Sequence, residues 1–193
     1  TLALAVLRPA AVSHSLPDSL YGLASQAEQA AACGAQLALL PERALWWPRE
    51  RMLVVADLHL GKAAAFRAAG VPVPEQTTHA TLARLTAAIE RTGASQVLCI
   101  GDLLHARTGR TQAILDAVGA WRAAHAGLTI RLVRGNHDER SGDPPDDWDI
   151  VCVDEPWRRS PFAWRHRPAV EPGCYAIAGH SHPAAVGAEL GHA

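Results

Sequence analysis

The stretch that decides the fold is Val97-Leu98-Cys99-Ile100-Gly101-Asp102-Leu103-Leu104-His105. Its first four residues are apolar and predict a buried strand, so that Gly101 and Asp102 come where the strand ends. A carboxylate has two oxygens and bridges cations about 3.5–4 Å apart, which is the spacing of two-metal hydrolytic sites. We therefore interpret Asp102 as a candidate shared metal ligand and expect further ligands at the ends of other strands.

The segments on either side of this stretch alternate between strand and helix patterns. Apolar runs at 36–40, 52–56 and 129–133 predict strands, and apolar spacing predicts helices over 75–91 and 112–125. Short strands are expected near 150–153, 162–166 and 175–178, a turn-rich segment at 41–48 and one weak helix over 19–32. This succession predicts a layered α/β fold with mixed sheets. We expect residues 1–35 to be an N-terminal extension and residues 36–193 to form a single domain.

The bulk composition narrows the classes of protein. With 193 residues, 49% of them hydrophobic and 19% charged, the chain is typical of a folded domain, and it has no apolar run long enough to span a bilayer. The apolar start lacks a preceding basic segment, so it does not indicate a secretory signal. A net charge of −1 gives no overall field for a polyanion. Four separated cysteines are expected to be reduced core residues, which favours a cytoplasmic location.

Four polar clusters follow four of the predicted strands. They are Asp57-Leu58-His59, Gly101-Asp102, Gly135-Asn136-His137-Asp138 and Gly179-His180-Ser181-His182. Ligand sites of open α/β sheets gather at the carboxyl ends of strands, and the glycines permit tight backbone turns there. Mixed imidazole and carboxylate donors suit Mn²⁺, Fe or Zn²⁺. The clusters together predict a metal centre.

The order of these motifs resembles the calcineurin-like metallophosphoesterase superfamily over roughly residues 37–183. The resemblance implies two packed mixed β-sheets flanked by helices. Within the superfamily, the segments 40–47, 56–62 and 133–138 resemble the bacterial ligase-associated DNA damage response endonuclease group. Members of this group are encoded alongside an ATP-dependent DNA ligase, a helicase and an exonuclease-like protein, so a functional association with such proteins is expected.

The resemblance also assigns the metal ligands by position. It implies that Asp57, His59 and His182 hold the first ion, that Asn136, His166 and His180 hold the second, and that Asp102 bridges them. His166 is assigned as a ligand because it is the only histidine between His137 and His180. The cofactors are expected to be two divalent ions, Mn²⁺ first and Fe or Zn²⁺ as alternatives. The family usually continues with further strand after Gly-His-x-His, so either a terminal segment is missing or one sheet lacks an edge.

Three residues are candidates for the catalytic steps beside the metal ions. His137 is expected to protonate the leaving alkoxide or to stabilise charge, and Asp138 to orient His137 or another histidine. His105 occupies a position that is acidic in many superfamily members, and either a substrate-side or a supporting hydrogen-bonding role fits it.

Other residues are candidates for contacts with the substrate. Arg107 and Arg134, with Arg110, are candidate phosphate contacts, against the alternative of ion-paired surface arginines. Lys62 is expected either to face the substrate or to cap a helix. Four tryptophans are expected either to stack on bases or to belong to the core: Trp46, Trp47, Trp157 and Trp164.

Three functions are weighed on these observations. The first is hydrolysis of DNA phosphodiester bonds by attack of a metal-bridging hydroxide, in endonuclease or end-processing steps of bacterial repair. The second is hydrolysis of a nucleotide or other small phosphoester, which the near-neutral charge favours. The third is a metal-poor interaction scaffold, which the complete ligand set argues against.

Overall fold

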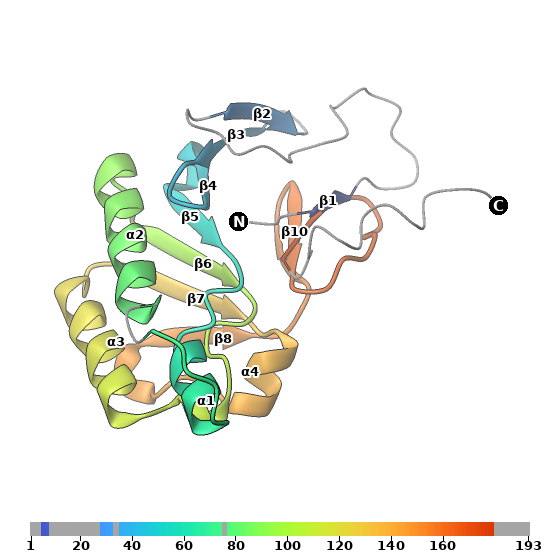
Figure 1. The fold of residues 1–193 in the computed structure, drawn as a ribbon. Coiled ribbons are helices and arrows are strands. Elements are labelled where there is room, and N and C mark those ends of the chain that lie inside the picture. Colours follow the sequence, from blue (N-terminus) through green and yellow to red (C-terminus); the bar gives the residue numbers. More distant parts are fainter. Residues whose placement is uncertain (1–4, 8–27, 33–34, 75–76, 180–193) are drawn as a thin grey trace.

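The computed structural model describes residues 5–7, 28–32, 35–74 and 77–179, and these form two mixed β-sheets with helices (Figure 1). The larger sheet has seven strands whose order in space equals their order in the chain. Counted along this order, the first three pairs of neighbouring strands are antiparallel and the last three pairs are parallel. The strands are β2 (Glu28–Ala32), β3 (Ala35–Leu40), β4 (Ala44–Trp47), β5 (Met52–Val55), β6 (Gln96–Ile100), β7 (Thr129–Val133) and β8 (Ile150–Val153).

The smaller sheet has the strand order β1-β11-β10-β9. Its strands are β1 (Ala5–Leu7), β9 (Trp157–Arg159), β10 (Phe162–Arg165) and β11 (Tyr175–Ala178). The two middle strands, β10 and β11, are parallel, and the two outer strands pair antiparallel with them. A segment from the start of the chain therefore completes a sheet that is otherwise built from its last described part.

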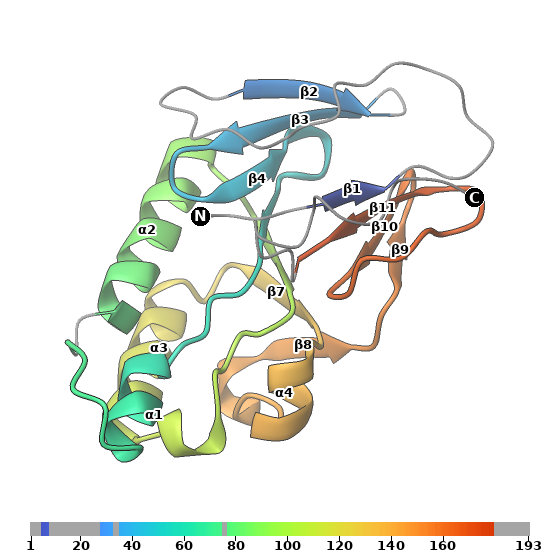
Figure 2. The ribbon, with the colours of Figure 1, turned by 45° about the vertical axis from the view of Figure 1, so that its right-hand side comes forward.

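The long helices α2 (Thr77–Thr92) and α3 (Gln112–Ala124) cover one face of the seven-stranded sheet, and the small sheet lies on the opposite side (Figure 2). The short helices α1 (Lys62–Ala68) and α4 (Asn136–Ser141) follow β5 and β7. Three 3₁₀ turns complete the described elements: η1 (Pro48–Glu50), η2 (Arg107–Gly109) and η3 (Asp146–Trp148). No helix within the described ranges is long and apolar enough to cross a bilayer.

Strand β6 shows how the apolar run builds two cores at once. Successive side chains of a strand point to opposite faces of the sheet. Val97 and Cys99 accordingly pack against the helices, whereas Leu98 and Ile100 pack against the small sheet. Because both faces are covered, all four side chains are buried and no polar residue interrupts the run. The central strand is thereby fixed between two layers, and its carboxyl end delivers Gly101 and Asp102 to a defined place.

The tryptophans resolve mainly as core residues. Trp47 and Trp164 are fully buried, and Trp47 meets Phe162 edge to face with ring centroids 5.1 Å apart. Trp46 is partly buried against the helix-side core, and the guanidinium of Arg131 lies over the partly buried Trp157 ring. The base-stacking alternative is therefore wrong for Trp47 and Trp164.

Two sequence expectations differ from the structure. The segment predicted to be turn-rich contains β4, because Ala44, Leu45 and Trp47 are buried between the neighbouring strands β3 and β5. The prolines at either end of this four-residue strand concealed it. The weak helix expected over 19–32 is wrong for Glu28–Ala32, which pair antiparallel with β3 as β2. The helix α4 and the strand β9 were not predicted.

Candidate functional site

Asp57 and His59 are presented by a strained turn at the end of β5. Both residues have left-handed backbone conformations, with φ of 53° and 45°, and Asp102 has φ of 54°. Side chains other than glycine rarely adopt this conformation, and such outliers cluster at functional sites. The turn is held against the loop after β6, because the backbone N–H of His59 donates to the carbonyl of Asp102 at 2.8 Å. Two strand ends are thus joined into one platform that carries three of the predicted ligands.

Asp102 lies between the predicted ligands of both ions. Its Oδ2 is 3.8 Å from Nε2 of His59, and its Oδ1 is 3.6 Å from Nε2 of His166. The Asp102 side chain is only 2% exposed. Oδ1 also accepts a hydrogen bond from the backbone N–H of His137 at 3.0 Å. The two oxygens therefore face different histidines, which is the arrangement that a shared carboxylate ligand needs.

His166 and Asn136 face each other on the second side of Asp102. Nε2 of His166 is 2.9 Å from Oδ1 of Asn136, and the His166 side chain is 1% exposed. The ring packs so closely over the end of β6 that a Cβ at Gly101, where φ is +82°, would collide with its Nδ1. Gly101 is therefore required both for its backbone conformation and for this approach. The structure thus places His166, predicted as a ligand from its order in the chain, beside Asn136 and Asp102.

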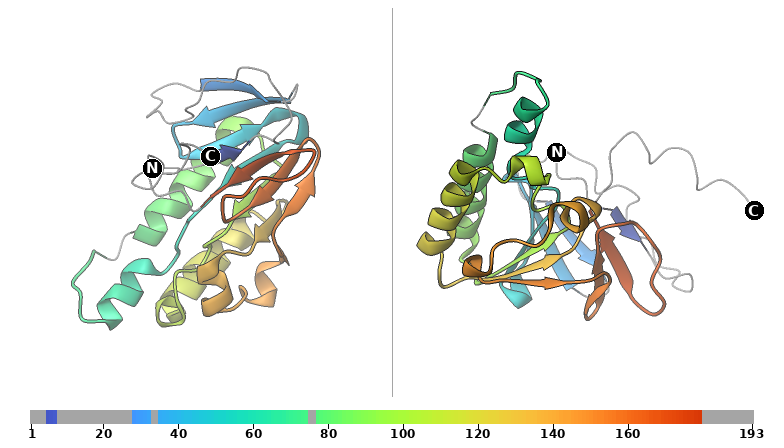
Figure 3. Two further views of the ribbon diagram at one scale, coloured as in Figure 1. Left: turned by 90° about the vertical axis from the view of Figure 1, so that its right-hand side faces the viewer. Right: turned by 90° about the horizontal axis from the view of Figure 1, so that it is seen from below.

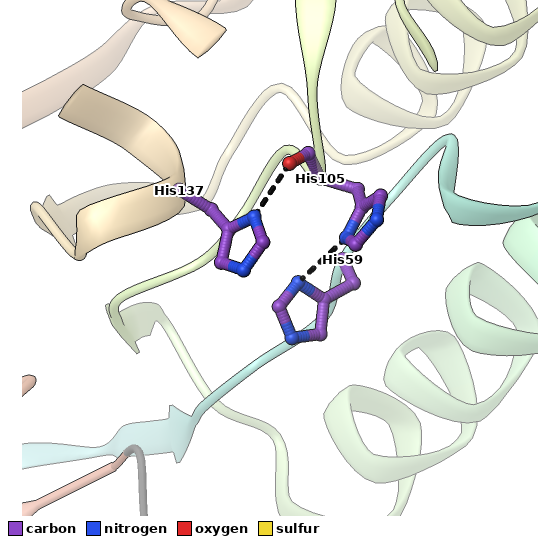
Figure 4. Close-up of side chains that lie close together, drawn as sticks. All are labelled: His59, His105 and His137. Atoms are coloured by element: carbon purple, nitrogen blue, oxygen red, sulfur yellow. Dashed lines mark hydrogen bonds between the residues drawn. The ribbon is translucent and has the colours of Figure 1, made fainter. Parts of the chain in front are cut away.

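Three histidines gather on the first side of Asp102 (Figure 4). Nδ1 of His105 lies 3.4 Å from Nδ1 of His59, and the His105 ring stacks on the His137 ring with centroids 4.8 Å apart. Nδ1 of His137 lies 2.7 Å from the backbone carbonyl oxygen of His105, to which it donates. This bond directs Nε2 of His137 toward the interior of the site, 4.0 Å from Oδ2 of Asp102. His105 thus borders both a predicted ligand and the predicted proton donor.

Burial favours the neutral form of two imidazoles of this cluster, those of His59 and His105. Burial lowers the pKa of His59 to about 4, against the opposing attraction of Asp102. Burial, followed by the charges of His137 and Lys62, also lowers the pKa of His105. A neutral imidazole is the form that coordinates metal. His59 is therefore in its ligand form at neutral pH.

Asp138 has a different role from the one predicted. Its carboxylate accepts four backbone hydrogen bonds: from Asp102 at 2.7 Å, Gly135 at 2.9 Å, Leu103 at 3.0 Å and Leu104 at 3.3 Å. Burial raises the pKa of Asp138, and the bonds from Gly135, Leu104 and Asp102 oppose this shift. Asp138 therefore fixes the Asp102 loop to the start of α4, and the expectation that it orients a histidine is corrected. Its role depends on main-chain groups, which leave no pattern in the sequence.

The arginines expected to bind phosphate are engaged with the protein. Arg134 makes a two-pronged ion pair with Asp143, at 2.8 and 2.7 Å, and a further bond to Asp154 at 2.9 Å. This pairing raises the pKa of Arg134 and lowers that of Asp143. Arg110 donates to carbonyl oxygens at the end of α4, and Arg107 donates to the carbonyl of Arg140 at 3.2 Å. Arg134 and Arg110 are therefore engaged in bonds within the protein, as the alternative to phosphate contact predicts.

One supporting residue was not found from the sequence. Oε2 of Glu155 accepts hydrogen bonds from the backbone N–H groups of His166 and Arg167, at 2.7 and 2.9 Å, and so fixes the end of β10 that carries the His166 ring. Glu155 follows a short strand and belongs to no motif, so only the fold reveals this contact. The predicted ligands His180 and His182 lie outside the described residues.

The described donors fit divalent metal ions. Ligand atoms of Asp57, His59 and Asp102 all lie within 4.8 Å of one another, and His166, Asn136 and the second oxygen of Asp102 form the neighbouring group. The set consists of imidazole nitrogens and carboxylate or amide oxygens, without thiolates, which suits Mn²⁺, Fe or Zn²⁺. Asp57, His59 and Asp102 would hold one ion, and Asp102, Asn136 and His166 would hold the other.

Comparisons with known proteins agree with this geometry. A family model described as calcineurin-like phosphoesterase matches residues 50–171. Among solved structures, the nuclease MPE of Pseudomonas putida is 43% identical in sequence, with a TM-score of 0.68. The match covers 75% of this chain and 68% of that chain. A comparison with curated proteins gives no match.

Proposed function

This chain belongs to the calcineurin-like phosphoesterase family, and from that premise we propose that it is a two-metal phosphodiesterase that cleaves DNA. The observation that carries the proposal is the position of Asp102, whose two oxygens face His59 on one side and His166 on the other. The similarity to the Pseudomonas putida nuclease MPE, at 43% identity, supports a nucleic-acid substrate. A role in bacterial DNA repair, beside a ligase and a helicase, follows from the resemblance to the ligase-associated group.

The residues divide the reaction between them. Divalent ions held by this set would neutralise the phosphate and make hydroxide available near neutral pH. Asp102 lies on the loop that Asp138 fixes. It therefore holds the ligand group of His59 and the ligand group of His166 at a constant separation. The imidazolium form of His137 supplies the proton to the leaving alkoxide from Nε2, because its Nδ1–H is committed to the His105 carbonyl. The product alcohol then leaves with that proton, and His137 takes up a proton from solvent, which balances the proton released when water forms the hydroxide.

Hydrolysis of a small phosphoester is the second candidate, and the arginines favour it. Arg134 and Arg110 are tied to Asp143 and to the end of α4, so neither offers a free guanidinium to a long polyanion. The net charge of −1 points the same way. The two candidates share the metal chemistry and differ only in what surrounds the phosphate.

A metal-titrated assay tests the proposal. Protein stripped with a chelator is expected to be inactive, and Mn²⁺ is expected to restore cleavage of plasmid DNA and of bis(p-nitrophenyl) phosphate together. Restored cleavage of a cyclic nucleotide or the aryl diester, with plasmid left intact, would select the second candidate. Protein that binds no transition metal and stays inactive with Mn²⁺, Fe²⁺ and Zn²⁺ would contradict both.

The role of His137 gives a separate prediction. In His137→Ala, hydrolysis of DNA is expected to fall about a hundredfold, whereas hydrolysis of a p-nitrophenyl diester falls much less. The reason is that p-nitrophenolate is a stable leaving group and needs no proton. His79→Ala, which changes an exposed histidine on α2, is the matched control and is expected to behave as wild type. Equal losses on both substrates would contradict proton donation by His137.

A further inference from the structure

Helix α1 projects beside the histidine cluster as one wall of the site. It is drawn in teal in Figure 3, where it stands clear of the sheets together with the chain that follows it. The helix buries the small side chains of Ala63, Ala64 and Ala65 against the protein. Its opposite face carries Lys62 and Phe66, and both side chains are exposed. The helix therefore presents a cation and an aromatic ring to solvent at the edge of the site.

Phe66 continues the aromatic surface of the active site. Its ring centroid is 5.6 Å from that of His105, which in turn stacks on His137 at 4.8 Å. Phe66 is nevertheless 38% exposed. Of the large apolar side chains that are exposed in the described ranges, Phe66 and Val71 both lie on this projection. Single exposed apolar residues are ordinary, but an exposed phenyl ring beside the histidine cluster offers a stacking surface at the edge of the site.

Lys62 adds a positive charge on the same face. Its Nζ lies 5.8 Å from the centroid of the Phe66 ring. The charge is also close enough to the site to contribute to the lowered pKa values of His59 and His105. A ring beside an ammonium group complements a nucleotide, whose base has a π-face and whose phosphate is an anion. No other described side chain near the cluster provides this pair, because Arg110 and Arg134 are engaged elsewhere.

We propose that α1 forms a nucleotide subsite, in which Phe66 stacks on the base next to the cleaved bond and Lys62 contacts the adjoining phosphate. The subsite rests on the proposed function and specifies how DNA is held. The base must be unstacked from its neighbour to reach Phe66, so the nucleotide beside the cleaved bond is turned out toward α1. The subsite also explains how a chain with a net charge of −1 engages a polyanion, since most of the contact is aromatic.

A cycle of protein and substrate changes tests the subsite. Wild type and Phe66→Ala are each assayed with Mn²⁺ on an oligonucleotide with normal bases and on oligonucleotides with an abasic residue on either side of the cleaved bond. Removing the contacted base is expected to lower kcat/KM of wild type about tenfold, the effect of one stacked base. Phe66→Ala is expected to lose the same factor on the normal oligonucleotide and nothing more on the abasic one.

Control variants separate stacking from general damage. Phe66→Trp keeps a ring and is expected to keep the sensitivity to base removal. Val151→Ala changes another exposed apolar residue, on the edge strand β8, and is expected to match wild type. Losses that simply add in the cycle would overturn the subsite alone. A wild type that cleaves the aryl diester but none of the oligonucleotides would overturn the proposed DNA substrate and the subsite with it.

Lys62 has its own measurement. In Lys62→Gln, the slope of log KM against log salt concentration is expected to decrease by about 0.7, the contribution of one phosphate contact on a single strand. Arg49→Gln serves as the matched control, because Arg49 lies on the 3₁₀ turn before β5, at the opposite end of that strand from the site. An unchanged slope in Lys62→Gln would remove the phosphate contact from the proposal.

Discussion

Replacing Asp102 with asparagine is expected to lower kcat/KM for bis(p-nitrophenyl) phosphate about a thousandfold at saturating Mn²⁺. The amide is neutral and offers one oxygen, so it cannot give anionic ligand atoms to both groups of donors. The fold is expected to persist, since an amide Oδ1 can still accept the hydrogen bond from His137 N–H. Calorimetric titration with Mn²⁺ is expected to show weakened binding at both sites, because the carboxylate is shared.

The control for this variant is Asp116→Asn. Asp116 is an exposed carboxylate on α3 that accepts a hydrogen bond from Gln112. The Asp116→Asn variant removes the same charge far from the site, and its activity is expected to match that of wild type. Activity of Asp102→Asn within tenfold of wild type, with unchanged circular dichroism, would contradict a shared ligand at this position.

Asp138→Ala is expected to lower the free energy of unfolding by about 3 kcal/mol or more, since several backbone N–H groups lose their buried acceptor at once. The four donors belong to the Asp102 loop and to Gly135, so the loss also loosens the platform that carries Asp102 and His137. Urea unfolding followed by circular dichroism measures the first effect. Hydrolysis of the aryl diester, measured on the folded fraction, reports the second.

Two further variants sharpen this prediction. Asp138→Asn keeps one acceptor oxygen but turns an amino group toward backbone donors, so its stability is expected to fall between those of wild type and Asp138→Ala. Asp116→Ala removes an exposed carboxylate and is expected to unfold like wild type. A free energy of unfolding for Asp138→Ala that lies within about 1 kcal/mol of the wild-type value would be too small a loss for a buried network. It would show that the four bonds do not stabilise the loop as described.

Three of the predicted ligands could be placed from the sequence, because each follows an apolar run that ends at one edge of the larger sheet. Asp57, Asp102 and Asn136 come directly or almost directly after β5, β6 and β7, and these strands are parallel neighbours. Their convergence therefore follows from the fold class alone. His166 came from resemblance and order, and the structure brings it to Asn136 across 30 positions of the chain.

The remaining features depend on contacts that no local pattern encodes. Asp138 accepts hydrogen bonds from backbone groups up to 36 positions away. Arg134 contacts Asp143 because the intervening helix α4 brings the two residues together. β4 is too short to show a clear alternation between its flanking prolines. Phe66 follows three alanines that carry the buried face of α1, so the sequence alone does not distinguish it from a core residue.

The contacts that hold α1 in place do not involve Lys62 and Phe66, the two side chains that it presents at the site. The helix begins directly after Gly61, whose backbone packs on that of Gly109, and a Cβ on either residue would collide with the carbonyl group of the other. The backbone N–H of Gly61 also donates to Oγ1 of Thr78 at 3.1 Å. The helix is thus located by main-chain contact and by alanines. Substitutions at positions 62 and 66 are consequently expected to change the chemistry of this wall without moving the helix that carries it.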